Sequence, residues 1–176
     1  GFGFKEPIRA VILGSRGGVG EAIARALIDA HPLNRALLTS RSLAELPLHS
    51  EMISWYALEI TSEDQWEIFI PRLKSHLADW GGSLNLVINA TGLLHTEGSA
   101  RAGVEGTQEV QPERSMRAVA LKSMESVFAV NTFAVALALK YLSPMFPRRE
   151  RSLFVSFSAR VGSISDNRIG GWYSYR

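Results

Sequence analysis

The sequence of 176 residues contains no cysteine. Without thiols the chain can form neither disulfide bonds nor thiolate metal sites, so a disulfide-stapled secreted domain is excluded. No apolar run is long enough to cross a bilayer, and no secretory leader is visible. We therefore predict a cytoplasmic protein with no membrane partner and no metal site.

The sequence also has little excess of charge of one sign. Lys and Arg number 19 and Asp and Glu number 17, which leaves a formal net charge of +2. Arg148, Arg149 and Arg151 cluster before a predicted strand, but a nucleic-acid surface needs more basic side chains on one face. We interpret the cluster as a solvated loop and predict no nucleic-acid partner.

What the sequence does contain is an alternation of short apolar runs and helical segments. Five runs have the length and composition of buried strands, at 8–13, 36–40, 53–59, 84–89 and 153–157. Helices are predicted after the first run, after Thr61 and from about Ser123 to Leu142. This order predicts an α/β fold with a doubly wound parallel sheet of the Rossmann type, and the length predicts one domain.

Apolar spacing predicts which faces of the helices are buried. The first helix should end at His31 and Pro32 and bury Ala22, Ile23, Ala26, Leu27 and Ala30. Ser62 and Gln65 have the spacing of a capping box at the start of the second helix. The apolar stripe of that helix comprises Trp66, Phe69, Ile70, Leu73 and Leu77.

Residues 93–117 show no apolar period and contain three glycines and a proline. A loop of this length in a compact domain is usually functional. We interpret it as a loop over a binding site and expect it to be mobile without ligand.

Several polar or glycine-rich segments follow predicted strands directly. They are 14–20, Ser40 with Arg41, 89–92, and Ser158. In doubly wound sheets, ligands bind at the carboxyl ends of the strands where the winding reverses. These segments therefore predict one binding site at that edge of the sheet.

Gly14, Gly18 and Gly20 lie between the first strand and the first helix. A dinucleotide pyrophosphate needs a tight turn, close backbone approach and a helix amino terminus, all of which glycine permits. The spacing differs from the usual Gly-x-Gly-x-x-Gly, and a plain strand–helix turn is the alternative. We predict a phosphate-binding turn.

The end of the second strand, Thr39-Ser40-Arg41, carries no acid. An acid there would accept hydrogen bonds from a ribose 2′-hydroxyl and repel a 2′-phosphate. Arg16 and Arg41 instead suit a phosphate through charge and bidentate geometry. The alternative is two solvated arginines. We predict NADP(H), in preference to NAD(H).

Four motifs together resemble the short-chain dehydrogenase/reductase family. They are Gly14-Ser15-Arg16-Gly17-Gly18-Val19-Gly20, Asn89-Ala90-Thr91-Gly92, Asn131 in Phe-Ala-Val-Asn-Thr, and Ser158 followed by Tyr175. The second motif has Ala90 where the family has a second asparagine. Within the family, the segment from Ser158 to Tyr175 is most similar to the C-factor-like and sniffer-like reductases.

The resemblance implies the site residues. Glu59 and Ile60 would lie beside the adenine, and Asn89 would be mainly structural. The implied cofactor-binding residues are Gly14, Ser15, Arg16, Gly18, Val19, Gly20, Ser40, Arg41, Glu59, Ile60, Asn89, Ala90, Thr91 and Gly92. The substrate would be a small carbonyl compound or alcohol, and the assembly a homodimer or homotetramer.

The implied catalytic residues are Asn131, Ser158 and Tyr175. Ser158 would hydrogen-bond the substrate carbonyl, Tyr175 would donate the proton, and Asn131 would hold a water. The family's lysine, four residues after the tyrosine, is not in the sequence, which stops at Arg176. The resemblance thus implies that the NAD(P)-binding domain, residues 1–176, is incomplete after its fifth strand.

Alternatives remain at each position. Ser163 lies nearer to Tyr175 in sequence, Tyr173 competes as the tyrosine, and His95 is another potential acid. A non-catalytic nucleotide-binding signalling module is a second hypothesis for the whole protein. A doubly wound methyltransferase is a third, but it typically carries an acid after the second strand.

Overall fold

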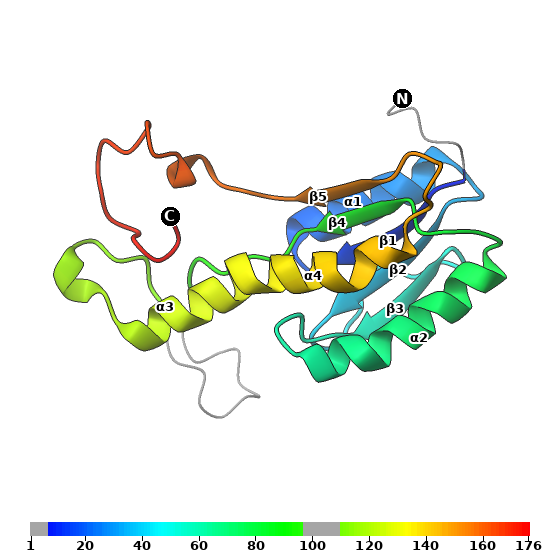
Figure 1. Ribbon diagram of the computed structural model, residues 1–176, viewed down its shortest axis with the longest axis horizontal. Helices are drawn as coiled ribbons and strands as arrows, with labels where there is room; N and C mark the ends of the chain where they lie inside the picture. The colour runs from blue at the N-terminus through cyan, green and yellow to red at the C-terminus, as the bar shows by residue number, and fades with distance from the viewer. Residues whose placement is uncertain (1–6, 97–109) are drawn as a thin grey trace. The chain divides into compact units, whose positions relative to one another are not determined.

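The computed structural model describes residues 7–96 and 110–176 (Figure 1). It consists of two compact units. The first comprises Gly1–Thr91 and Val135–Phe157 and contains the sheet; the second comprises Gly92–Ala134 and Ser158–Arg176. The single domain over residues 1–176 remains a prediction.

The first unit is built on five parallel strands. They are β1 (Arg9–Leu13), β2 (Arg35–Ser40), β3 (Ile53–Ala57), β4 (Leu86–Asn89) and β5 (Leu153–Ser156). Their order is β3-β2-β1-β4-β5, and every neighbouring pair is parallel. The five predicted strands and the doubly wound sheet are confirmed. Since β4 returns to the other side of β1, the winding reverses between these two strands.

Side chains of the strands alternate between the two faces of the sheet. On one face, the helix α1 (Gly18–Ala30) packs against the central strands through a cluster comprising Ala10, Ile12, Ala24, Leu27, Ala36, Leu38, Leu86 and Ile88. The helices α2 (Glu63–Asp79) and α4 (Ala134–Leu142) cover the other face (Figure 1). The central strands β1, β2 and β4 are therefore buried, as their apolar side chains require, whereas the edge strands β3 and β5 stay partly exposed.

The predicted buried face of α1 was wrong in part. Ala22, Ala26 and Ala30 are exposed, and the buried residues are Gly20, Ala24, Leu27 and Ile28. The reason is Gly20, at which a Cβ would lie 2.5 Å from the Gly14 carbonyl oxygen. This close approach turns Gly20 toward the sheet, and the residues four, seven and eight positions later follow it onto that face.

The helix α2 begins as predicted. Ser62 is its N-cap, and its hydroxyl accepts a hydrogen bond from the Gln65 N–H (3.4 Å). The second arm of the predicted capping box is different, because the Gln65 side chain accepts from the Glu59 N–H (2.6 Å). Four of the five residues of the predicted stripe are buried: Trp66, Phe69, Leu73 and Leu77.

The predicted helix over 123–142 contains a π-helical turn. It comprises α3 (Leu121–Phe128), the turn η2 (Ala129–Phe133) and α4. In the first unit, Tyr141 stacks on Trp66 of α2, with ring centroids 5.6 Å apart and planes at 2°. Lys140 also pairs with Glu63 at 2.5 Å, so α2 and α4 are joined by apolar and ionic contacts.

The helical stretch Leu121–Met145 is long and apolar enough to cross a bilayer, with a hydropathy of 1.4. The expectation that no run would reach this length was therefore wrong. Length and composition alone do not distinguish a membrane span from a core helix. Of the most apolar window of this stretch 22% is buried, and the buried residues of the stretch include Ala138 and Leu142, which have no exposed surface.

A buried hydroxyl in β2 lacks a partner. Thr39 is 1% exposed, and its Oγ1 makes no hydrogen bond within the part of the chain that the structure describes. We expect Thr39→Val to raise the free energy of unfolding by about 1 kcal/mol, because an unpaired buried hydroxyl carries an uncompensated desolvation cost. Ser15→Ala is the control, since the Ser15 hydroxyl donates to the Ile12 carbonyl (2.6 Å) and its loss should lower stability. Urea unfolding measures both, and a loss of stability in Thr39→Val would contradict the expectation.

Candidate nucleotide site and catalytic segments

The turn after β1 lies at the reversal point of the sheet. Gly14 has φ +78°, and a Cβ there would lie 2.9 Å from the Thr91 side chain and 3.1 Å from the Ala90 backbone. Only glycine fits this left-handed conformation without strain. The turn after β1 and the segment after β4 therefore touch, as the sequence predicted for two segments at one sheet edge.

The fold requires glycine at only one of the other two predicted positions of the turn. Gly20 is required by its contact with the Gly14 carbonyl, whereas a Cβ at Gly18 would meet no atom within 4 Å. The fold itself therefore does not require glycine at position 18. Gly18 begins α1, and Gly17 before it supplies no side-chain cap. An exposed helix amino terminus with free N–H groups is left at this point.

Ser15 and Val19 flank these glycines in opposite environments. Ser15 is fully buried, its N–H donates to the Thr39 carbonyl (2.9 Å) and its hydroxyl donates to Ile12. These bonds tie the turn to β1 and β2. Val19 is 55% exposed and lies on the open side of the turn, where a ligand could cover it.

Two arginines stand free near the cofactor-selective positions. Arg16 and Arg41 are exposed, and neither makes an ion pair or hydrogen bond with the residues that the structure describes. Ser40 closes β2, and its hydroxyl accepts from the Ser42 N–H (3.4 Å). The missing acid leaves this strand end with cationic side chains and a hydroxyl.

Glu59 and Ile60 follow β3. The Glu59 carboxylate accepts from the Thr61 hydroxyl (2.8 Å) and N–H (3.2 Å). Ile60 is 6% exposed, and its carbonyl accepts from the Trp66 indole (2.9 Å). Both residues thus shape the link from β3 to α2.

Asn89 ties the ends of two strands together. Its amide donates to the Ser156 hydroxyl (3.2 Å), and its oxygen accepts from the Thr91 hydroxyl (2.5 Å) and N–H (3.2 Å). The residue is 2% exposed. These bonds fix the segment after β4 in place, which is the structural role implied by the resemblance.

In the second unit, Asn131 lies in the π-helical turn η2. Its side-chain oxygen accepts from the Leu93 N–H (2.8 Å), and its amide donates to the Leu93 carbonyl (2.8 Å). The side chain is thus committed to the segment that follows Gly92. A π-helical turn is frequently found at functional sites.

Ser158 is exposed and lies two residues beyond the end of β5 at Ser156. The strand predicted over 153–157 ends one residue earlier, so Ser158 does not follow it directly. The alternative Ser163 is engaged locally, because its hydroxyl accepts from the Asp166 N–H (3.3 Å) and lies 3.2 Å from the Ser165 hydroxyl. Ser158 is the less committed of the two serines.

Tyr175 is half-buried, and its ring meets the Trp172 ring edge-on with centroids 6.2 Å apart. Tyr173 is 37% exposed. His95 is exposed, as expected of a solvated histidine. Sequence reasoning missed Glu113, whose buried carboxylate accepts hydrogen bonds from Ser174. No periodicity marks Glu113, because it lies in the segment interpreted as a loop.

The predicted loop over 93–117 is described only at its two ends, and residues 97–109 lie outside the described part of the chain. The ends are joined, because the Thr96 N–H donates to the Val110 carbonyl (2.9 Å) and the Val110 N–H donates to the Thr96 hydroxyl (2.8 Å). The two described ends of the predicted loop are thus hydrogen-bonded to each other.

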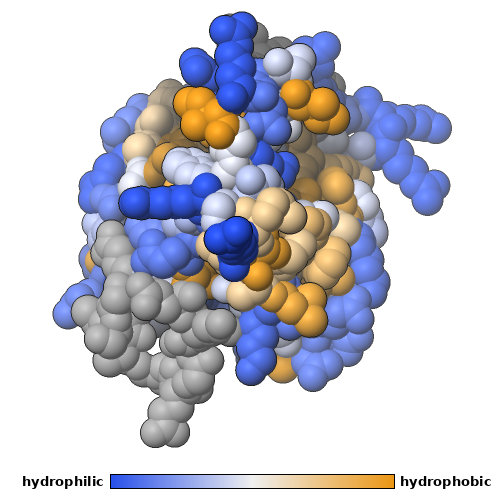
Figure 2. All heavy atoms as spheres, turned by 90° about the vertical axis from the view of Figure 1, so that its left-hand side faces the viewer, coloured by the Kyte–Doolittle hydropathy of each residue, from blue (hydrophilic) through white to orange (hydrophobic). Residues whose placement is uncertain are grey.

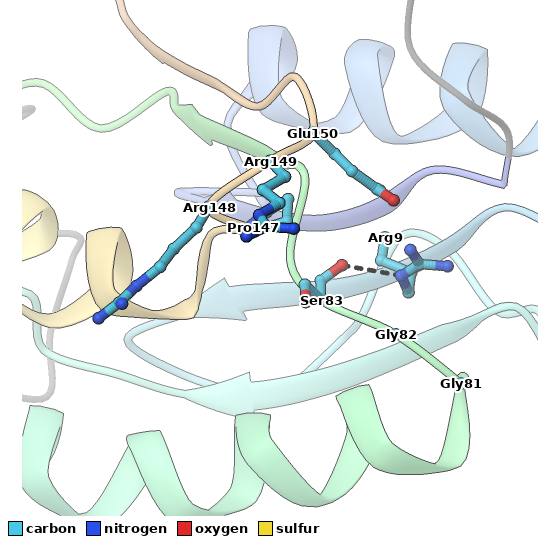
Figure 3. A pocket seen from close by; sticks show the side chains of 8 residues that line it. All are labelled: Arg9, Gly81, Gly82, Ser83, Pro147, Arg148, Arg149 and Glu150. Carbon is cyan, nitrogen blue, oxygen red and sulfur yellow. Dashed lines mark hydrogen bonds between the residues drawn. The ribbon is translucent and has the colours of Figure 1, made fainter.

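A hollow of about 440 Å³ lies at the opposite, amino edge of the sheet (Figure 3). It is lined by Arg9, Gly81, Gly82, Ser83, Pro147, Arg148, Arg149 and Glu150. Arg9 donates to the Ser83 carbonyl at 2.8 Å. Since ligands of such sheets bind at the carboxyl edge, this hollow is separate from the candidate nucleotide site. No cluster of metal-ligating side chains occurs in residues 7–96 and 110–176.

Apolar side chains are exposed in the second unit, among them Met116, Leu121, Phe133, Ile164 and Ile169. Figure 2 shows apolar (orange) groups separated by polar (blue) side chains on the face it presents.

Comparison with solved structures places the fold. The Sniffer protein of Caenorhabditis elegans, assigned as a carbonyl reductase, superposes with a TM-score of 0.70 at 19% identity, covering 93% of this chain and 68% of that one. A short-chain dehydrogenase/reductase from Burkholderia multivorans with bound NADP gives 0.74 at 20%, covering 97% and 67%. A short-chain dehydrogenase from Leptospira borgpetersenii with bound NAD+ gives 0.69 at 14%, covering 93% and 56%.

These similarities establish that the chain has the Rossmann-type fold of short-chain dehydrogenases and reductases. It spans 56% to 68% of the length of these three proteins. No family model matches the sequence, and no curated protein matches it by sequence.

Proposed function

We propose that this protein is an NADP(H)-dependent oxidoreductase of the short-chain dehydrogenase/reductase type, from the C-factor-like and sniffer-like branch. Its substrate would be a small carbonyl compound or alcohol, and it would act in the cytoplasm as a homodimer or homotetramer. The observation that carries the proposal is Gly18. It opens α1 at the reversal point of the sheet, yet nothing within 4 Å of its missing Cβ requires glycine there.

The residues of the first unit fit a dinucleotide. The turn at Gly14 and the packing of Gly20 bring the backbone to the amino terminus of α1, where N–H groups and the helix dipole favour a phosphate. Arg16 and Arg41 are exposed and uncommitted, so they can pair with a 2′-phosphate without breaking another contact. The neighbours with bound NADP and NAD+ support this proposal.

The chemistry of the second unit fits carbonyl reduction. When bound, the reduced nicotinamide would supply a hydride to the carbonyl carbon. Ser158 would donate a hydrogen bond to the carbonyl oxygen, and Tyr175 would donate the proton that completes the alcohol. The Asn131 side chain holds the Leu93 backbone, so its part in the relay would be to set the π-helical turn and present a main-chain group to water.

Cofactor selectivity gives a direct test. We expect Arg41→Ala to weaken NADPH binding at least tenfold and to change NADH binding by less than twofold, because a charge-assisted hydrogen bond to phosphate contributes about 1.5–3 kcal/mol. Isothermal titration calorimetry on the full-length protein measures both affinities.

The matched control is Arg148→Ala, which removes an arginine from the opposite edge of the sheet. It should leave both affinities unchanged. Equal losses for NADPH and NADH in Arg41→Ala would contradict the assignment of the 2′-phosphate contact.

A further inference from the structure

Three consecutive residues before the candidate catalytic tyrosine have left-handed backbones. Gly170, Gly171 and Trp172 have φ of +72°, +73° and +54°. Glycine adopts this conformation freely, but tryptophan does so only under constraint. A non-glycine residue in this region persists where surrounding contacts over-determine it, and such residues gather at functional sites.

The constraint comes from Glu113, 61 residues earlier in the sequence than Ser174. The Trp172 N–H donates to the Glu113 carbonyl (2.6 Å), and the Ser174 N–H donates to the Glu113 carboxylate (3.3 Å). The Ser174 hydroxyl donates to the other carboxylate oxygen. Glu113 therefore holds alternate residues of the segment that leads into Tyr175.

Arg176 holds the same turn from its other end. Its guanidinium donates to the carbonyls of Gly171 (2.7 Å), Gly170 (3.2 Å) and Val161 (2.5 Å). A Cβ at Gly171 would lie 3.0 Å from the Glu113 carbonyl oxygen, so glycine is also needed for the close approach of the two backbones.

Glu113 is 4% exposed and Ser174 is 6% exposed. Burial raises the pKa of the Glu113 carboxyl, but the hydrogen bonds from the Ser174 hydroxyl and from nearby main-chain N–H groups outweigh it, and the pKa is lowered. The group is thus a buried carboxylate at neutral pH. Such a group is kept ionised only by donors that satisfy it, so it resists movement of those donors.

We propose that Glu113 is a positioning residue for Tyr175, which holds Trp172 and Ser174 so that the strained turn presents the phenol in one orientation. This inference rests on the proposed function, in which Tyr175 is the general acid. Tyr175 follows Ser174 directly, and its ring also contacts that of Trp172. Both of its nearest anchors are therefore set by Glu113.

The test compares Glu113→Gln, Glu113→Asp and the control Glu67→Gln in the full-length protein; Glu67 is an exposed glutamate of α2. In Glu113→Gln the charge is lost and the new amide can face the Ser174 donors. We expect amide exchange of residues 170–176 to rise at least tenfold, with exchange in β1 and β4 unchanged. We also expect kcat for carbonyl reduction to fall at least tenfold, with KM for NADPH within twofold. Glu113→Asp should recover part of both losses, and Glu67→Gln should match the wild type.

Each outcome decides a separate point. If the wild type reduces carbonyls but Glu113→Gln leaves amide exchange in residues 170–176 unchanged, Glu113 does not hold this turn and the proposal is overturned. Faster exchange with unchanged kcat would show a merely structural contact and would overturn the positioning role. A wild type that reduces no carbonyl would overturn the proposed function. Amide exchange in residues 170–176 would still show whether Glu113 holds Trp172 and Ser174. If Glu113→Gln lowers the folded fraction, Ser174→Ala removes one bond of the same pair and should show the same pattern with smaller amplitude.

Discussion

Replacing Tyr175 by phenylalanine should abolish carbonyl reduction and leave the nucleotide site intact. The phenol is the proton donor in the proposed reaction, and removal of a general acid typically lowers the rate by about 10²- to 10⁴-fold. The ring and its edge-on contact with Trp172 are kept, so the turn before it should not change. Steady-state NADPH oxidation with a panel of small aldehydes and ketones measures kcat, and calorimetry measures NADPH affinity.

Tyr173→Phe is the matched control, because Tyr173 is two residues away and 37% exposed. It should retain most of the activity. Loss of activity in Tyr173→Phe with retention in Tyr175→Phe would show that the catalytic tyrosine had been assigned to the wrong position.

Two substitutions in the glycine turn should affect NADPH binding and folding stability separately. We expect Gly18→Ala to fold with wild-type stability and to lose NADPH affinity at least tenfold, since the new Cβ meets no protein atom within 4 Å but would stand where the backbone must approach a phosphate. Gly14→Ala should lower the free energy of unfolding by more than about 2 kcal/mol, because alanine is strained at positive φ and its Cβ would press on Ala90.

Urea unfolding and NADPH calorimetry, run on both variants, distinguish these effects. The pair is informative because the two glycines are four residues apart in one turn. Full NADPH affinity in Gly18→Ala would contradict the proposal that this helix terminus holds the pyrophosphate.

The strands and their order could be predicted because apolar runs, glycine turns and parallel connections leave few topologies. The buried face of α1 was misplaced because the prediction counted only apolar side chains. Gly20, which has no side chain, is the residue that sets this face through its contact with Gly14. A glycine in a helix can mark the closest packing, and apolar periodicity does not detect it.

Some contacts of the candidate site could be predicted from the sequence, and others could not. The meeting of Gly14 with Ala90 and Thr91 was predictable, since both segments follow neighbouring strands. The Asn131 pairing with Leu93 and the Glu113 pairing with Ser174 join residues 38 and 61 positions apart. Neither is fixed by a strand end, so only the three-dimensional structure reveals them.

The central claim, that the protein transfers hydride between NADPH and a carbonyl compound, is tested most directly by isotope transfer. The full-length protein is incubated with NADPH deuterated at C4 of the nicotinamide, on either face in parallel, together with the carbonyl panel. Mass spectrometry then examines the alcohols formed. We predict an alcohol with one deuterium on its carbinol carbon from one of the two labelled cofactors, and none from Tyr175→Phe. An unlabelled alcohol from both cofactors, or no alcohol while calorimetry shows bound NADPH, would contradict the account.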